Sequence, residues 1–192
     1  MRTIRKTLLL TALAGGLALA GCSKKTEEAP SDEASAGLQA IAPGAKSVPD
    51  VLENADGLQT VAEALKETGI ATVLKGKGSY TLLAPEDDTF DSLGDSGKAL
   101  TQSDDHAAMA ALLKTHMLPG YITPQDIGRA IDASKDGQVS MPNFNGQALT
   151  FSRSGQAIVV TAPDGSHAQL DGDPIAGGAS IAIPVDGVLR KI

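Results

Sequence analysis

The sequence predicts an α+β domain, because helical periodicity fills most of its first half and short strands fill its second half. The helical pattern is clearest over residues 58–67, and the strand pattern over 149–151 and 181–185. One early strand, Tyr80 to Ala84, stands among the helical segments. Helices and strands segregated along the chain in this way favour α+β over an alternating α/β arrangement.

Three helices are predicted from apolar stripes and end signals. The first ends before Gly69, and its stripe is Leu58, Val61, Ala62 and Leu65. The second begins at a Ser103 cap followed by two acidic residues, and its stripe is Met109, Leu112, Leu113 and His116. The third opens with the cap Thr123, the first-turn proline Pro124 and an acidic first turn, and it runs through Ile131.

Strands are predicted where β-branched or alternating apolar residues lie between turn signals. They cover Leu149 to Phe151, Ile158 to Val160 and Ile181 to Val185, and Pro163–Gly165 is a turn. Pro184 interrupts the last strand, and proline has no N–H for the ladder. We therefore expect that strand to lie at a sheet edge or to be bulged there.

Residues 1–21 are expected to be a cleavable signal rather than part of the fold. A basic start is followed by a small and apolar run from Thr7 to Ala20, which is shorter than the roughly 20 residues a spanning helix needs. The run ends in Leu19, Ala20, Gly21 and Cys22, which resemble the lipobox of bacterial lipoproteins. The Cys22 thiol would carry the lipid, and as the single cysteine it excludes an intrachain disulfide.

Residues 22–46 are predicted to be the lipidated cysteine and a flexible tether, and residues 47–192 a single domain. Without the signal, 13 basic and 23 acidic residues leave a net charge of −10, so nucleic acid and electrostatic membrane binding are excluded. The membrane partner is therefore reached through the lipid anchor. Ser23 follows the cysteine where the sorting rule of enterobacteria would place Asp for inner-membrane retention. By that resemblance we expect a cell-envelope protein at the outer membrane.

No catalytic, metal or cofactor site is predicted. The segment Gly94–Gly97 is similar to a serine-protease loop, but without triad partners it is expected to be a solvated loop. Residues 132–137 resemble the start of a calcium loop, yet position twelve is Asn143, so a helix-to-strand turn is expected. The histidines lack metal-ligand spacing. His116 is expected to be a hydrogen-bonded, half-buried core residue, with contact to a ligand as the alternative.

Several segments together resemble the fasciclin domain family, from about Val48 to Arg190. They are residues 60–65, the string Tyr80 to Phe90, residues 112–121 and the string Val185 to Leu189. The positions that match the family signature, and that we expect to be structural, are Ala84, Pro85, Phe90, His116, Gly120 and Asp186. The resemblance implies a compact wedge of β-strands flanked by helices.

The resemblance also implies a function in surface interaction: adhesion, or association with matrix or biofilm, through an unknown protein or polysaccharide ligand. A periplasm-facing envelope protein that binds a small molecule or assists assembly is the alternative, and an enzyme is the least favoured class. The chain has only five Phe and Tyr residues and no Trp. This scarcity counts modestly against stacking on carbohydrate.

Overall fold

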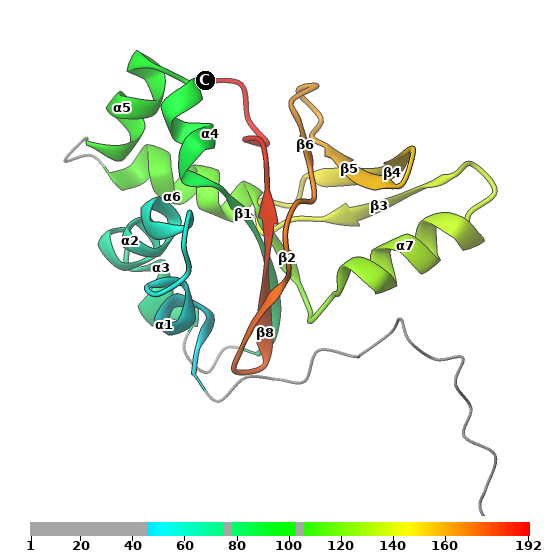
Figure 1. Cartoon of the computed structure of the whole chain (residues 1–192), viewed down its shortest axis with the longest axis horizontal. Helices are drawn as coiled ribbons and strands as arrows, with labels where there is room; N and C mark the ends of the chain where they lie inside the picture. Colours follow the sequence, from blue (N-terminus) through cyan, green and yellow to red (C-terminus); the bar gives the residue numbers. More distant parts are fainter. Residues whose placement is uncertain (1–45, 75–77, 103–105) are drawn as a thin grey trace, which may run out of the picture. The chain divides into compact units, whose positions relative to one another are not determined.

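The computed structural model of the chain describes residues 46–74, 78–102 and 106–192 (Figure 1). The helices are α1 (Val48–Leu52), α2 (Gln59–Glu67), α3 (Ile70–Leu74), α4 (Asp87–Ser92), α5 (Asp95–Thr101), α6 (His106–Thr115) and α7 (Pro124–Ala133). The strands are β1 (Tyr80–Pro85), β2 (Met117–Pro119), β3 (Gln138–Pro142), β4 (Ala148–Ser154), β5 (Ala157–Thr161), β6 (His167–Gln169), β7 (Ile175–Gly177) and β8 (Ser180–Val185).

The predicted α+β class is confirmed: helices dominate the first half, and all strands except β1 lie in the second half. The predicted helices over 58–67 and 123–131 are present as α2 and α7. The signal, the lipobox, tether residues 23–45 and the Ser103 cap lie outside the described residues. Within the described ranges, no helix is both long and apolar enough to cross a membrane.

The first sheet has the strand order β2-β1-β8-β7, and its two central strands run parallel. Every residue of β1 and β8 is buried, so these strands are covered on both faces. Leu82 and Ala84 pack into a core with α1, α2 and α6, whereas Leu83, Ile183 and Val185 pack into a second core. Because successive strand residues point to opposite faces, the sheet is the shared wall of the two cores.

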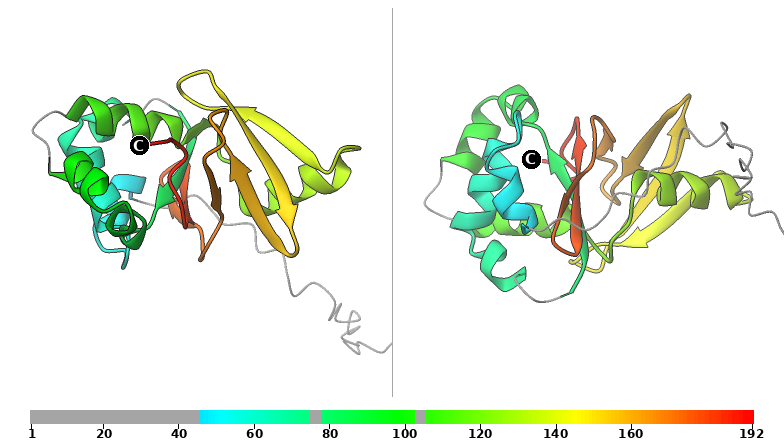
Figure 2. Two further views of the ribbon diagram at one scale, coloured as in Figure 1. Left: turned by 90° about the horizontal axis from the view of Figure 1, so that it is seen from above. Right: turned by 60° about the horizontal axis from the view of Figure 1, so that its bottom comes forward.

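The second sheet has the order β3-β4-β5-β6, and all of its pairs are antiparallel. Along β4, buried residues alternate with more exposed ones, as expected for an antiparallel sheet that is covered on one side. Helix α7 lies against β3 and β4, as both views of Figure 2 show. The contact is apolar, and its main side chains are Ile127, Ile131, Leu149 and Phe151.

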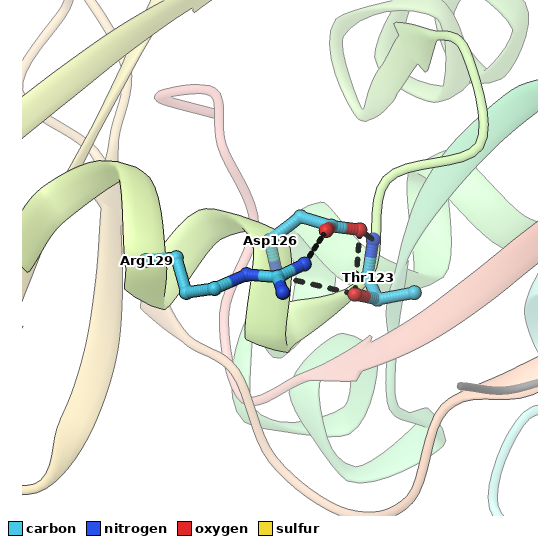
Figure 3. A network of polar contacts seen from close by, with 3 residues as sticks. All are labelled: Thr123, Asp126 and Arg129. Atoms are coloured by element: carbon cyan, nitrogen blue, oxygen red, sulfur yellow. Dashed lines mark hydrogen bonds and ion pairs between the residues drawn. The ribbon is translucent and has the colours of Figure 1, made fainter. Parts of the chain in front are cut away.

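A network of polar contacts at the start of α7 joins Thr123, Asp126 and Arg129 (Figure 3). The backbone N–H of Asp126 donates to Thr123 Oγ1 at 3.1 Å, and Asp126 Oδ2 accepts from the Thr123 backbone N–H at 3.0 Å. This reciprocal pair is a capping box. Arg129 forms an ion pair with the same carboxylate. The hydrogen bonds from Thr123, followed by Arg129, lower the pKa of Asp126.

Strand β8 lies between β1 and β7, but β7 pairs only with Ser180 to Ala182, and the register shifts before the isolated Leu170–Val185 bridge. The prediction of an edge or a bulge at Pro184 is therefore confirmed locally. The Pro184 carbonyl accepts from the backbone N–H of Asp171 at 2.9 Å. In a strand, the N–H and C=O of one residue point to the same side, so the missing donor faces the 170–171 segment rather than β1. The parallel ladder with β1 therefore loses no hydrogen bond to the proline.

Candidate functional site

His116 follows the last residue of α6 and is completely buried, so the expectation of a half-buried ring is wrong. Its Nε2 accepts the backbone N–H of Leu189 at 3.0 Å, which means that Nε2 carries no hydrogen. Nδ1 therefore carries the hydrogen and donates it to the Leu112 carbonyl, 2.9 Å away. Both ring nitrogens are satisfied by backbone groups, and this pairing makes complete burial of the ring tolerable.

The environment keeps this ring neutral. Burial lowers the pKa of His116 from its ordinary 6.5 to about 4, although the hydrogen bond to Leu112 acts in the opposite direction. A buried neutral imidazole with both nitrogens occupied has no free group for a ligand or a proton transfer. The geometry gives His116 a scaffold role, in which it joins α6 to the C-terminal segment.

The signature residues in β1 and α4 are also part of the scaffold. Ala84 lies in the helical core, Pro85 is the last residue of β1, and Phe90 of α4 is buried in the same core. Asp87, in the same string, accepts the N–H groups of Gln59 and Thr60 at 3.2 and 2.8 Å. It caps α2 from a distance, because Leu58 at the cap position has no side-chain acceptor.

The two remaining signature residues hold turns. Gly120 has a φ of 95°, which favours glycine, and its carbonyl accepts the Thr81 hydroxyl at 2.8 Å. Asp186 and Gln169 hold each other: the Gln169 N–H donates to Asp186 Oδ1 at 2.6 Å, and the Asp186 N–H donates to the Gln169 carbonyl at 3.1 Å. Neither the hydroxyl of Thr81 nor the long-range cap by Asp87 was predicted from the sequence. The signals were a hydroxyl within an apolar strand and a helix start without its own cap.

The other sequence motifs lie apart from one another in the described residues. The expectation of a loop at Gly94–Gly97 is wrong, because Gly94 is the N-cap of α5 and Asp95 to Gly97 form its first turn. Residues 134–137 form the expected turn between α7 and β3. His106 Nδ1 lies 3.8 Å from Glu67 Oε2, and His167 is exposed on β6. In the described ranges, no group of three or more His, Cys, Asp or Glu side chains is placed to hold a metal ion.

One face near the ends of β1 and β8 is acidic. Partial burial raises the pKa of Glu86, and the carboxylates of Asp171, Asp88, Asp186 and Asp87 raise it further. Repulsion among these groups makes the face unfavourable for an anionic partner.

Two hollows of the described surface differ in the character of their lining. One, of about 310 Å³, lies between α1, α3 and residues 177–180, and its lining is mostly apolar. The other, of about 470 Å³, lies where the end of α6 meets the turns at 143–147 and 162–164 and residues 189–190. Its lining is mostly polar, and its polar residues are Thr115, Asn145, Gln147, Asp164 and Arg190. We call it the polar groove.

The fold and these contacts define an α+β domain in which the signature residues build the scaffold. The chain belongs to the Fasciclin domain family, whose sequence pattern matches residues 56–190. Domains of this family are in general adhesion modules rather than enzymes.

The chain is also similar to one curated protein and to one solved structure. The chain is 27% identical over 153 residues to Protein sll1483 of Synechocystis sp., an alignment that covers 79% of each chain. Its fold is similar to that of the FAS1 domain pair from the insect cell adhesion molecule Fasciclin I, with a TM-score of 0.55 and 18% identity. That match covers 69% of this chain and 45% of the insect chain, so this chain spans less than half of that protein's solved pair.

Proposed function

We propose that this chain is a lipid-anchored protein of the cell envelope whose fasciclin domain mediates adhesion, or association with matrix or biofilm. The observation that carries the proposal is membership of the Fasciclin family over residues 56–190. The insect protein with the similar fold is a cell adhesion molecule. The placement of the signature residues supports this proposal, because their side chains make contacts within the scaffold and a partner would bind at the surface.

The anchor and the tether are part of the proposed mechanism. Leu19 to Cys22 support lipidation at Cys22, and two or three acyl chains hold a protein on a membrane stably. The tether of 24 residues from Ser23 to Lys46 spans roughly 25–30 Å as a flexible coil. Many copies on one surface then add weak single contacts through their effective concentration.

The lipid anchor is tested by replacing Cys22 with Ser. The variant should lack radiolabelled acyl chain and should be extracted from cells without detergent, while a Ser23→Ala control should remain in the membrane fraction. Acyl label on the Cys22→Ser protein would show that the lipobox assignment is wrong. Fractionation of the wild-type protein tests the outer-membrane placement.

Adhesion is tested in whole cells. Cells that display the protein should aggregate or attach more than a deletion strain, and removal of residues 23–46 with Cys22 retained should weaken attachment without changing the melting temperature. A Gly/Ser segment of the same length should restore attachment, because reach rather than sequence matters. A deletion strain with normal attachment but a leaking or stress-sensitive envelope would reject the proposal in favour of a periplasm-facing binding or assembly role.

A further inference from the structure

The polar groove is bounded by a turn that is held rigidly in place. Asn143 is buried, and its Nδ2 donates to the Thr115 carbonyl at 3.1 Å. Its Oδ1 accepts the N–H groups of Asn145 and Gln147 at 3.0 and 2.9 Å. Asn145 Nδ2 in turn donates to Thr115 Oγ1 at 3.0 Å and to the Ala111 carbonyl at 3.2 Å. The turn at 143–147 is thereby fixed to α6 and presents its side chains without a large ordering cost.

Several polar groups of this rigid groove are left over for a ligand. Within the described part of the chain, the side-chain amide of Gln147 and the guanidinium of Arg190 make no hydrogen bond or ion pair. Asn145 Oδ1 accepts no hydrogen bond there. Asp164 is held by Ser166 and by the Lys191 N–H. These bonds lower the pKa of Asp164 to about 2, so its carboxylate stays ionised. The groove therefore offers donors, acceptors and one charge of each sign.

Apolar surface accompanies these polar groups. Ala162, Pro163 and Leu189 contribute to the lining.

We propose that the polar groove binds a neutral saccharide, with Gln147, Arg190, Asp164 and Asn145 Oδ1 pairing with its hydroxyl groups. A hydroxyl both donates and accepts, and therefore suits a site that mixes amide, guanidinium and carboxylate groups. The apolar lining of Ala162, Pro163 and Leu189 would contact the C–H faces of the sugar. The single Asp164 and Arg190 balance each other, and the mature chain carries −10, so an acidic polysaccharide is disfavoured. A volume of about 470 Å³ lies within the range of small-ligand sites.

The inference rests on the proposed function for its biological setting, and binding to the purified full chain tests it separately. The probes are maltotetraose, cellotetraose and chitotetraose, with tetragalacturonate as the charged comparison, and the measurement is saturation-transfer NMR with titration. At least one neutral tetrasaccharide should bind. Gln147→Ala and Arg190→Gln should each weaken binding about fivefold or more, since each removes a hydrogen-bonding group.

The matched control is Gln156→Ala, which removes an exposed amide from the turn between β4 and β5, outside the groove. It should bind as the wild type does, and all three variants should keep the wild-type melting temperature. The inference is overturned if no neutral probe binds, if tetragalacturonate binds more tightly, or if Gln147→Ala binds as the wild type does.

Failure of the inference and failure of the proposed function give different results. If cells displaying the protein adhere but the purified chain binds no neutral probe, the groove assignment fails and the adhesion proposal stands. If the purified chain binds a probe through Gln147 but the deletion strain adheres normally, the saccharide site stands and the adhesion proposal fails.

Discussion

The imidazole of His116 accepts the backbone N–H of Leu189 at 3.0 Å, and this bond joins residues 73 positions apart in the chain. The same ring donates to the Leu112 carbonyl one turn earlier in α6. A single side chain thus connects the helical layer with the C-terminal segment. Long-range bonds of this kind form only when both layers are folded, so we expect the domain to unfold cooperatively.

Replacing His116 with Leu should destabilise the domain by about 2–4 kcal/mol. Leu fills a similar volume but leaves the Leu189 N–H buried without an acceptor. Equilibrium unfolding in urea measures the change. The control His167→Leu alters an exposed residue of β6 and should change stability by less than about 0.5 kcal/mol. Equal effects of the two substitutions would disprove the scaffold role.

Stability should fall as the pH decreases from about 6.5 to about 4. The folded-state pKa of His116 is lowered to about 4, so in this interval the unfolded chain binds a proton that the folded chain does not. The contribution is present above the ordinary pKa of 6.5 and is lost as the pH approaches 4, up to about 3 kcal/mol. Urea midpoints measured across the interval check this. The slope should become shallower in His116→Gln, and an unchanged slope would assign the effect to other groups.

Replacing Asp87 with Ala should cost about 1–2 kcal/mol, because two N–H groups at the start of α2 lose their acceptor. Asp88 is the matched control, since it is exposed in the same first turn of α4 and makes no hydrogen bond to the described residues. Asp88→Ala should lose only a helix-dipole interaction, a few tenths of a kcal/mol. A melting experiment on both variants distinguishes the long-range cap from a local charge effect.

Two glycine substitutions should act in opposite directions. A Cβ at Gly177 would lie 2.4 Å from the Val48 backbone nitrogen, so Gly177→Ala must displace α1 and should cost about 2–3 kcal/mol or more. A Cβ at Gly128 would lie 3.0 Å from the guanidinium end of Arg153 and at an ordinary contact distance of 3.8 Å from Ile158 Cδ1. That end can shift, and its exposed ion pair with Asp132 contributes little. Gly128→Ala should therefore leave stability unchanged or raise it by up to about 1 kcal/mol through helix propensity. Denaturant midpoints compare the two, and a destabilised Gly128→Ala would contradict this.

Local patterns in the sequence were enough to predict several elements. The stripe of α2 with its stop at Gly69, the capped start of α7 and the apolar strand β1 all depend on residues within a few positions of one another. Their signals are periodicity, capping and backbone preference, which are physical properties of short segments. The α+β class followed because these segments occur in a segregated order.

Only the tertiary structure decided how those segments are completed. Pro184 is accommodated in β8 because its missing donor faces the 170–171 segment rather than β1, and His116 is fully buried because Leu189 provides its second partner. Asp87 caps α2 from 27 and 28 positions away. The polar groove likewise brings together residues from α6, two turns and the C-terminal segment. Each of these depends on groups distant in sequence, whose proximity follows from packing rather than from any local pattern.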